Sequence, residues 1–231
     1  NNELKTEFNV KANRIINDNL ATGLFVYGTY NGFKSFDHLG NNGKGDGFRD
    51  YPSQTQINVA NRWNYEVHDG LCSQTLINYT HEDRLGGQMA FTKDMKGSDS
   101  IYGLGGTVDR VHFFTKNGAP IGNTSSFGTQ LSATYFKQDA FYGLSNYEGV
   151  ETDVYANALV NTMVRGGHNV DFGASFRYTD LEENLYSTPY IGANQFISNL
   201  QEGDLRANFI KEEIVPGVFG QFNFIYDKIF V

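Results

Sequence analysis

The segment between residues 37 and 50 carries oxygen-bearing side chains at a spacing that could hold a metal ion. Its sequence, DHLGNNGKGDGFRD, intersperses acidic and amide residues with glycines, and hard cations such as Ca²⁺ take their ligands from such oxygens. The segment departs from the helix-loop-helix calcium motif, because Lys44 stands where an oxygen is required and no glutamate closes the loop. The alternative is a polar loop whose Asn, Asp and Gly residues only form turns. If calcium binds, the expected ligands are Asp37, Asn42, Asp46 and Asp50.

Aromatic side chains in the segments expected to be loops offer a second kind of site. Such rings can stack against a large amphipathic ligand, or they can pack each loop on itself, and the sequence leaves both possibilities open. The candidate ligand-binding residues are Phe36, Phe48, Tyr51, Phe91, Phe141, Tyr142, Tyr186 and Tyr190.

The histidines do not form a recognisable catalytic or metal-binding set. They are scattered along the chain, at His38, His68, His81, His112 and His168. His81 precedes Glu82 and Asp83, but the opposing carboxylate pair that an outer-membrane protease would need cannot be identified. We therefore expect no enzymatic activity, and no cofactor besides the possible calcium ion.

Composition excludes several classes of protein. The chain has 231 residues, of which 15% are aromatic and 19% charged, and its formal net charge is -8. This aromatic content excludes a disordered acidic tail, and an acidic chain without a basic cluster is a poor partner for nucleic acid. Cys72 is the single cysteine, which excludes an internal disulfide and a thiolate zinc cluster. No run approaches the roughly 18 apolar residues of a membrane-spanning helix.

Alternation with a period of two is the dominant pattern and predicts β-strands. One set of alternate positions in the clearest segments is uncharged, as in Ile57, Val59, Asn61, Trp63 and Tyr65. The intervening positions of these segments include the charged residues Lys5, Glu7, Lys11, Arg62, Glu66, Asp171 and Arg177. The sequence therefore predicts an all-β antiparallel fold with strands at about 3–16, 20–31, 54–66, 71–81, 102–116, 126–137, 150–163, 169–180 and 205–226, and a tenth strand from Ile229.

The connections between these strands alternate in length. Short turns are expected at 17–19, 67–70, 116–125, 164–168 and 227–228, and long loops at 32–53, 82–101, 138–149 and 181–204. Short turns at one end and long loops at the other are typical of a transmembrane β-barrel, with the turns in the periplasm and the loops outside the cell. Aromatic residues at the outer strand ends (Tyr30, Tyr79, Tyr135, Tyr178) and at the inner end (Trp63, Tyr65) fit the girdles expected at the two lipid interfaces.

Several phrases resemble the barrel of TonB-dependent outer-membrane receptors, in particular the vitamin and siderophore receptors of Bacteroidota. They are NRWNY at 61–65, EDRLGGQ at 82–88, QDAFYG at 138–143 and EIVPGVFGQF at 213–222. Such barrels have about 22 strands and a plugged lumen, so residues 1–231 are expected to form a single, partial barrel domain of nine or ten strands. We expect the signal peptide, the plug domain and the C-terminal strands to lie outside this sequence.

The resemblance implies energised import across the bacterial outer membrane. The expected cargo is a siderophore, cobalamin or a similar chelate, and the expected partners are outer-membrane lipid, the small-molecule ligand, and the TonB complex acting through the plug. Two alternatives remain open. One is a complete small barrel that acts as a passive pore or a protease, and the other is a soluble β-sandwich with an adhesive function.

Overall fold

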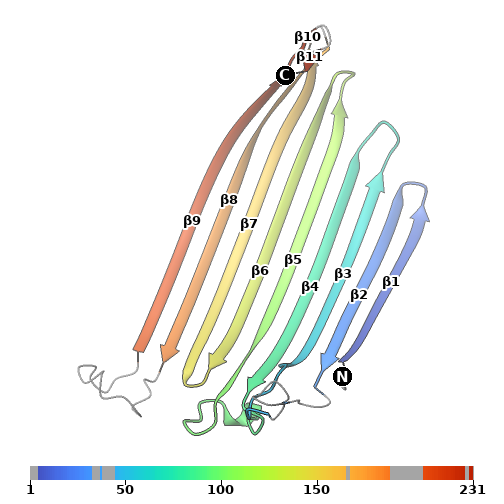
Figure 1. Cartoon of the computed structure of the whole chain (residues 1–231). Coiled ribbons are helices and arrows are strands. Elements are labelled where there is room, and N and C mark those ends of the chain that lie inside the picture. Colours follow the sequence, from blue (N-terminus) through green and yellow to red (C-terminus); the bar gives the residue numbers. More distant parts are fainter. Residues whose placement is uncertain are drawn as a thin grey trace.

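One continuous antiparallel sheet dominates the computed structural model, which describes residues 5–32, 37, 45–164, 167–187, 205–226 and 229–230. Its strands lie side by side in the order of the sequence, so every neighbouring pair is joined by a direct connection (Figure 1). The nine strands are β1 (Lys5–Asn17), β2 (Leu20–Asn31), β3 (Ser53–Glu66), β4 (Cys72–Gly87), β5 (Gly103–Ile121), β6 (Ser125–Tyr142), β7 (Ser145–Val164), β8 (His168–Ser187) and β9 (Leu205–Asn223).

Two small elements accompany the sheet. The short strands β10 (Ile225–Tyr226) and β11 (Ile229–Phe230) pair with each other, and the single-turn 3₁₀ helix η2 (Lys93–Met95) lies between β4 and β5. No helix in the described ranges is long and apolar enough to cross a membrane.

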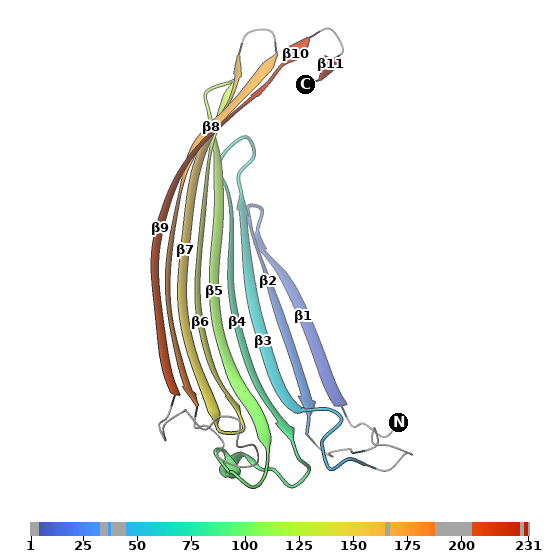
Figure 2. The same ribbon diagram turned by 60° about the vertical axis from the view of Figure 1, so that its left-hand side comes forward.

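The all-β antiparallel prediction is confirmed, and the sheet is not closed into a barrel. β1 pairs only with β2 and β9 only with β8 in the described sheet, so the two outermost strands each have one free edge. Both views show a bent, open sheet whose first and last strands lie far apart (Figures 1 and 2).

The connections gather at two ends, which we call the turn end and the loop end. The turn end holds the links from β1 to β2, β3 to β4, β5 to β6 and β7 to β8, and the loop end holds the others (Figure 1). Turn residues have the expected chemistry: Asp69 and Gly122 have positive φ angles of 53° and 64°, and the Asn17 side chain accepts a hydrogen bond from its neighbour's backbone, Asn19 N–H. Asn, Asp and Gly tolerate such conformations best.

The prediction of a long loop at 138–149 is wrong. β6 continues to Tyr142, β7 begins at Ser145, and a two-residue turn joins them, with Gly143 at φ 59°. A glycine with positive φ at the first turn position suits a tight hairpin. β4, β5, β7 and β8 also extend beyond the alternating pattern, because backbone pairing continues where the side chains no longer alternate between apolar and polar.

The sheet is a single layer with almost no interior. Among the described residues the buried hydrophobic side chains are only Phe91, Ala140 and Phe141. The chain exposes 16156 Å², whereas a compact protein of 25.9 kDa would expose about 10,500 Å². Folding therefore leaves most of the apolar surface of the strands uncovered.

Candidate functional site

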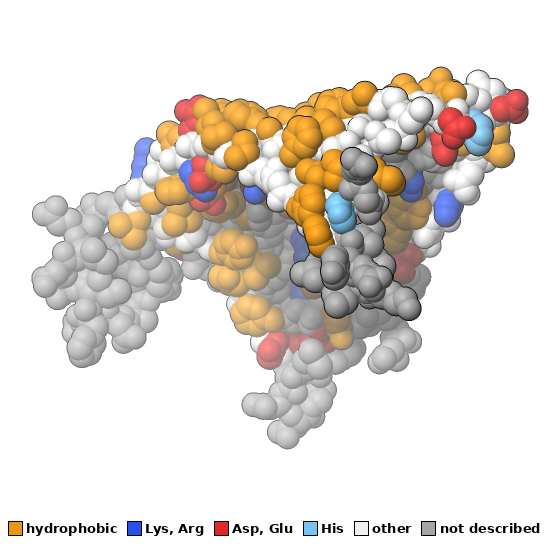
Figure 3. Space-filling model, turned by 90° about the horizontal axis from the view of Figure 1, so that it is seen from above, with side chains coloured by type: hydrophobic (Ala, Val, Ile, Leu, Met, Phe, Trp, Pro, Cys, Tyr) orange, Lys and Arg blue, Asp and Glu red, His pale blue; other side chains and the backbone are white. Residues whose placement is uncertain are grey.

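The largest surface feature is an uncovered apolar face of the sheet. Paired residues of an antiparallel sheet share a face, so the register places one alternate set from every strand on this side. We call this side the apolar face and the other the polar face. Hydrophobic side chains crowd one edge of the molecule when it is viewed from above (Figure 3). The middle of the apolar face, here the apolar belt, includes Val10, Val26, Val59, Ile77, Phe113, Leu131, Val154, Phe176, Ile214 and Val218.

Tyrosines bound the apolar belt toward the loop end. The tyrosines predicted at the outer strand ends are Tyr30, Tyr79, Tyr135 and Tyr178, and all of them lie on the apolar face. Two of the hydroxyl groups bond to acidic residues nearer the loop end: Tyr79 donates to Asp109 Oδ1 at 2.8 Å, and Tyr178 donates to Glu212 Oε1 at 3.4 Å. Each of these two rings is thus in the belt while its hydroxyl meets a polar rim, the arrangement typical of tyrosines at a lipid–water interface.

The tyrosine line crosses the sheet obliquely. If the register is followed from Tyr30 on β2 through the partner residue on each successive strand, it reaches Asn184 on β8. Tyr178 lies on the same strand, six residues from Asn184 toward the turn end. Each residue rises about 3.3 Å along a strand, and neighbouring strands lie about 4.8 Å apart. An offset of six residues over the six steps from β2 to β8 therefore means that the strands are tilted by roughly 35° from the normal to the tyrosine line. Strands of transmembrane barrels tilt by about 35–45°.

Aromatic residues also bound the belt at the turn end, along a line that drifts in the same direction. Trp63 and Tyr65 lie on β3. If the register is followed from Tyr65 across the sheet, it reaches Val218 on β9. Phe222 and Phe224 lie four and six residues farther toward the turn end, and the Phe224 ring stacks on His168 at 4.5 Å.

The two aromatic lines therefore run roughly parallel. Along β8, Tyr178 and His168 are ten residues apart, which at this tilt gives a belt about 27 Å high. The apolar band of a transmembrane barrel is about 25 Å tall.

Polar atoms inside the belt have partners. Asn61 donates to Thr22 Oγ1 at 3.2 Å and to the Gly23 carbonyl at 3.1 Å, and it accepts from the Trp63 indole N–H. The hydroxyl groups of Thr75 and Thr115 lie 3.1 Å apart across β4 and β5. Such pairing is required of polar groups that leave water.

The polar face is held by hydrogen-bonded and ionic networks. Asp153 accepts from Arg177 Nε at 2.7 Å and from Thr179 Oγ1 at 2.9 Å. Nearer the loop end, Tyr147 donates to Glu183 at 2.6 Å, and this bond with the carboxylate raises the pKa of Tyr147 to about 12. Groups that form such networks are typical of a surface in contact with water or with another polar surface.

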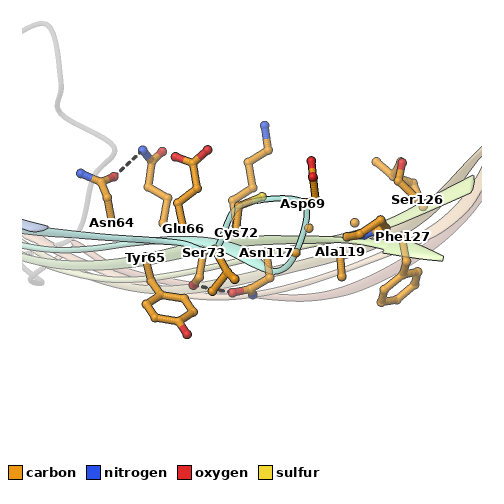
Figure 4. A pocket seen from close by; sticks show the side chains of 18 residues that line it. Asn64, Tyr65, Glu66, Asp69, Cys72, Ser73, Asn117, Ala119, Ser126 and Phe127 are labelled. Carbon is orange, nitrogen blue, oxygen red and sulfur yellow. Dashed lines mark hydrogen bonds between the residues drawn. The ribbon is translucent and has the colours of Figure 1, made fainter. Parts of the chain in front are cut away.

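A shallow depression of about 780 Å³ lies around Gly118 and Gly128 at the turn end. Figure 4 shows the sheet there in profile: Tyr65, Asn117 and Phe127 point to one side, and Asn64, Glu66 and Asp69 to the other. Because its lining comes from both faces, the depression is not one enclosed site for a ligand.

The structure brings two of the proposed calcium ligands together, with their carboxylates bonded to backbone. Asp37 accepts from the N–H groups of Asp46 and Gly47, at 2.7 and 2.8 Å, and Asp46 accepts from Phe48 N–H at 2.9 Å. Asn42 lies outside the described residues, and Asp50 is near the start of β3. Within the described ranges no three His, Cys, Asp or Glu side chains converge as a metal site would need.

The proposed aromatic ligand-binding residues occupy different environments. Phe91 and Phe141 are 1% and 5% exposed and pack on each other with ring centroids 5.8 Å apart, so neither ring is open to a ligand. Phe48, Tyr51 and Tyr142 are exposed, and the Arg206 guanidinium lies 5.3 Å from the Tyr186 ring. Phe36 and Tyr190 lie outside the described residues. Tyr102, which is not among the residues predicted from the sequence, directly precedes β5, and its ring centroid lies 6.4 Å from that of Phe48.

The histidines that the structure describes are separate from one another. His81 Nδ1 lies 2.8 Å from Asp109 Oδ1 on the apolar face, whereas Glu82 points to the polar face, where it pairs with Arg84. His112 contacts Ser132 on the polar face. His81 and Glu82 lie on opposite faces because they are adjacent in one strand.

Comparisons with protein families and with curated proteins find no match to this chain.

Proposed function

We propose that this chain is a wall segment of a transmembrane β-barrel in the bacterial outer membrane. The observation that carries the proposal is the pair of oblique aromatic lines around an uncovered apolar belt. Their tilt and separation agree with the strand tilt and apolar height of known barrels. A wall segment also accounts for the free edges of β1 and β9, since membrane barrels close all their edges with further strands.

The uncovered belt argues against a soluble β-sandwich. A sandwich buries the apolar face of one sheet against a second sheet about 10 Å away, and no second layer covers the belt among the described residues. Val218, for example, is 89% exposed on the apolar face. Lipid is the surrounding that would remove this surface from water.

The barrel we propose belongs to a TonB-dependent transporter that imports a siderophore, cobalamin or a similar chelate. Support comes from the motifs at 61–65, 82–88, 138–143 and 213–222, and from the polar face, which suits a lumen that holds a plug. In this proposal the apolar face meets lipid, the loop end lies outside the cell, and the TonB complex acts through the plug. The protein transports its ligand without chemical change.

Uptake by intact cells tests this function. We expect cells lacking this protein to lose accumulation of a radiolabelled ferric siderophore or of cyanocobalamin, and cells lacking TonB to lose it equally. Isolation of the native protein from outer membranes with an antibody against residues 205–223 should give an intact mass several times 25.9 kDa. Undiminished uptake of both ligands in the deletion strain would contradict the transport proposal.

A further inference from the structure

A second pocket lies at the loop end, on the side of the polar face. It has a volume of about 460 Å³, within the range of small-molecule sites. Its walls come from the segment after β4, the turn between β6 and β7, and the end of β8. We call it the hydroxyl pocket, after the side chains of Ser98, Ser100, Tyr102, Tyr142, Ser145 and Ser187 that line it.

The tight turn at Gly143 builds this pocket. This turn connects β6 to β7 at the loop end. Its Gly143 N–H donates to the Gly103 carbonyl at 2.7 Å, and this bond fixes the turn beside β5. Tyr102 N–H donates to Gln88 Oε1 at 2.7 Å. A Cβ atom at Gly143 would lie 3.1 Å from the Tyr102 ring, so this ring rests directly on the glycine.

The hydroxyl groups keep capacity for a ligand. Ser98 and Ser100 are paired at 3.1 Å, and Ser145 and Ser187 at 2.7 Å. Ser98 Oγ also accepts from the backbone N–H groups of Ser100 and Ile101, both at 3.3 Å. A hydroxyl group has one donor hydrogen, so each serine pair uses one of its two hydroxyl hydrogens and leaves a second donor for a ligand. Tyr102 and Tyr142 are 43% and 54% exposed and line the pocket beside these groups.

The charges of the lining restrict the ligand. Asp99 is the one charged residue in this pocket, which has no lysine or arginine among its described lining residues. An anionic ligand would lack a counter-charge and would face the Asp99 carboxylate. A neutral ligand that carries many hydroxyl groups, with C–H surfaces for the tyrosine rings, matches the lining best.

We propose that the hydroxyl pocket binds a neutral saccharide. Sugar hydroxyls exchange hydrogen bonds with the serines, and the apolar face of a pyranose ring packs on Tyr102 or Tyr142. The position of this pocket outside the cell rests on the proposed function, whereas the binding itself does not. The saccharide is either a free oligosaccharide or the sugar portion of an outer-leaflet glycolipid.

Binding of the purified full-length protein to a glycan array tests the proposal. The protein is kept in lauryldimethylamine oxide, because glycoside detergents would compete. The array carries neutral and acidic glycans, and the neutral set includes free oligosaccharides and those outer-core oligosaccharides of bacterial lipopolysaccharide that lack phosphate and acidic sugars. We expect retention on neutral glycans; retention on soluble oligosaccharides alone or on lipopolysaccharide cores alone then identifies the source.

Variants locate the site by titration with the best neutral glycan. Tyr102→Ala and Tyr142→Ala should each weaken binding at least tenfold, Tyr142→Phe should stay within threefold because it keeps the ring, and Tyr65→Ala at the turn end should bind as the parent does. Retention on acidic glycans alone, absence of retention, or undiminished binding by both alanine variants would overturn the proposal. Because no step requires uptake, these results are independent of the transport assay.

Discussion

The hydroxyl of Tyr79 on β4 donates a hydrogen bond to the carboxylate of Asp109 on β5, at the boundary between an apolar belt and a polar rim. The ring lies in a surface of aliphatic and aromatic side chains, and Asp109 Oδ1 also lies 2.8 Å from His81 Nδ1. Tyr178 and Glu212 repeat the tyrosine–carboxylate contact between β8 and β9. Because the two tyrosine–carboxylate contacts lie on one oblique line across the sheet, they mark a boundary relative to which the strands are tilted.

Arginine in the apolar belt should destabilise the protein in membranes. Val59→Arg and Phe172→Arg each place a charge near the middle of the belt, and we expect each to lower the free energy of unfolding from lipid vesicles by about 2–4 kcal/mol. Arg62→Gln, on the polar face of β3, should change it little, because Arg62 is exposed and donates to Asn64 on the same strand. Urea titrations followed by tryptophan emission measure these differences. Equal tolerance of all three variants would show that the faces are assigned wrongly.

Trp63 should report the turn-end interface. Its indole N–H donates to Asn61 on the apolar face, so the ring should lie near the lipid headgroups rather than at the bilayer centre. The emission difference between the parent protein and Trp63→Phe isolates this residue. We expect lipids brominated or doxyl-labelled near the headgroup to quench the difference signal more than lipids labelled at the chain end. Stronger quenching by lipids labelled at the end of the acyl chain would place Trp63 near the bilayer centre and contradict the assigned position of the turn-end interface.

Gly143 should tolerate a side chain less well than Gly122. Both have positive φ angles, of 59° and 64°, and an alanine in that conformation costs roughly 1–2 kcal/mol. Gly122 has no atom within 4 Å of an added Cβ, whereas Gly143 has the Tyr102 ring at 3.1 Å. Gly143→Ala should therefore be more destabilising than Gly122→Ala in urea titrations and should also weaken glycan binding. The same loss for both variants would mean that the Tyr102 contact has no influence.

Tyr147 should be among the last tyrosines to ionise. Its bond to Glu183, outside the apolar belt, raises its pKa to about 12, above the ordinary value of 10.0. A raised pKa in the folded state means that the contribution to stability is complete below pH 10 and is lost as the pH rises toward 12. Absorbance at about 295 nm, as a difference between the parent and Tyr147→Phe, follows this one group. Glu183→Gln should lower the pKa toward 10, and an unchanged titration would contradict the role of Glu183.

Calcium removal tests the interpretation of the Asp37 segment. Because both Asp37 carboxylate oxygens accept backbone N–H groups, we expect Asp37→Ala to increase proteolytic cleavage near residues 45–48, and calcium chelation to leave cleavage of the parent unchanged. Protection of this segment by added Ca²⁺, lost in Asp46→Asn, would support the alternative prediction of a calcium site.

The strands and their faces could be predicted from the sequence because alternation is local. Val59 and Arg62 are assigned to opposite faces by parity alone, and the register agrees. The ends of the strands could not be predicted, because beyond the belt the alternation of apolar and polar residues disappears while backbone pairing continues. Segment 138–149 looks like a polar loop, yet Gly143 makes it a tight hairpin.

The hydroxyl pocket could not be predicted from the sequence, because its residues come from separate strand ends. Tyr102 and Ser187 are distant in the sequence, and only the meander of β5 to β8 brings their ends to one place. Similarly, Phe91 and Phe141 look like exposed loop aromatics. Pairing of β5 with β6 places Phe141 opposite Gly105, and Phe91, from the segment after β4, packs over Gly103 and contacts Phe141. Contacts of this kind depend on register, which a periodic pattern does not specify at strand ends.

Lipid accessibility of adjacent residues shows whether one face of the sheet lies against lipid. In the full-length protein with Cys72→Ser, Val59→Cys and Asn58→Cys are labelled with an environment-sensitive fluorophore and placed in vesicles that contain doxyl-labelled lipid. We expect strong quenching and blue-shifted emission at position 59 and weak quenching at position 58, with the same contrast between Phe176→Cys and Arg177→Cys. Equal quenching at both members of each pair would contradict a wall with one face toward lipid.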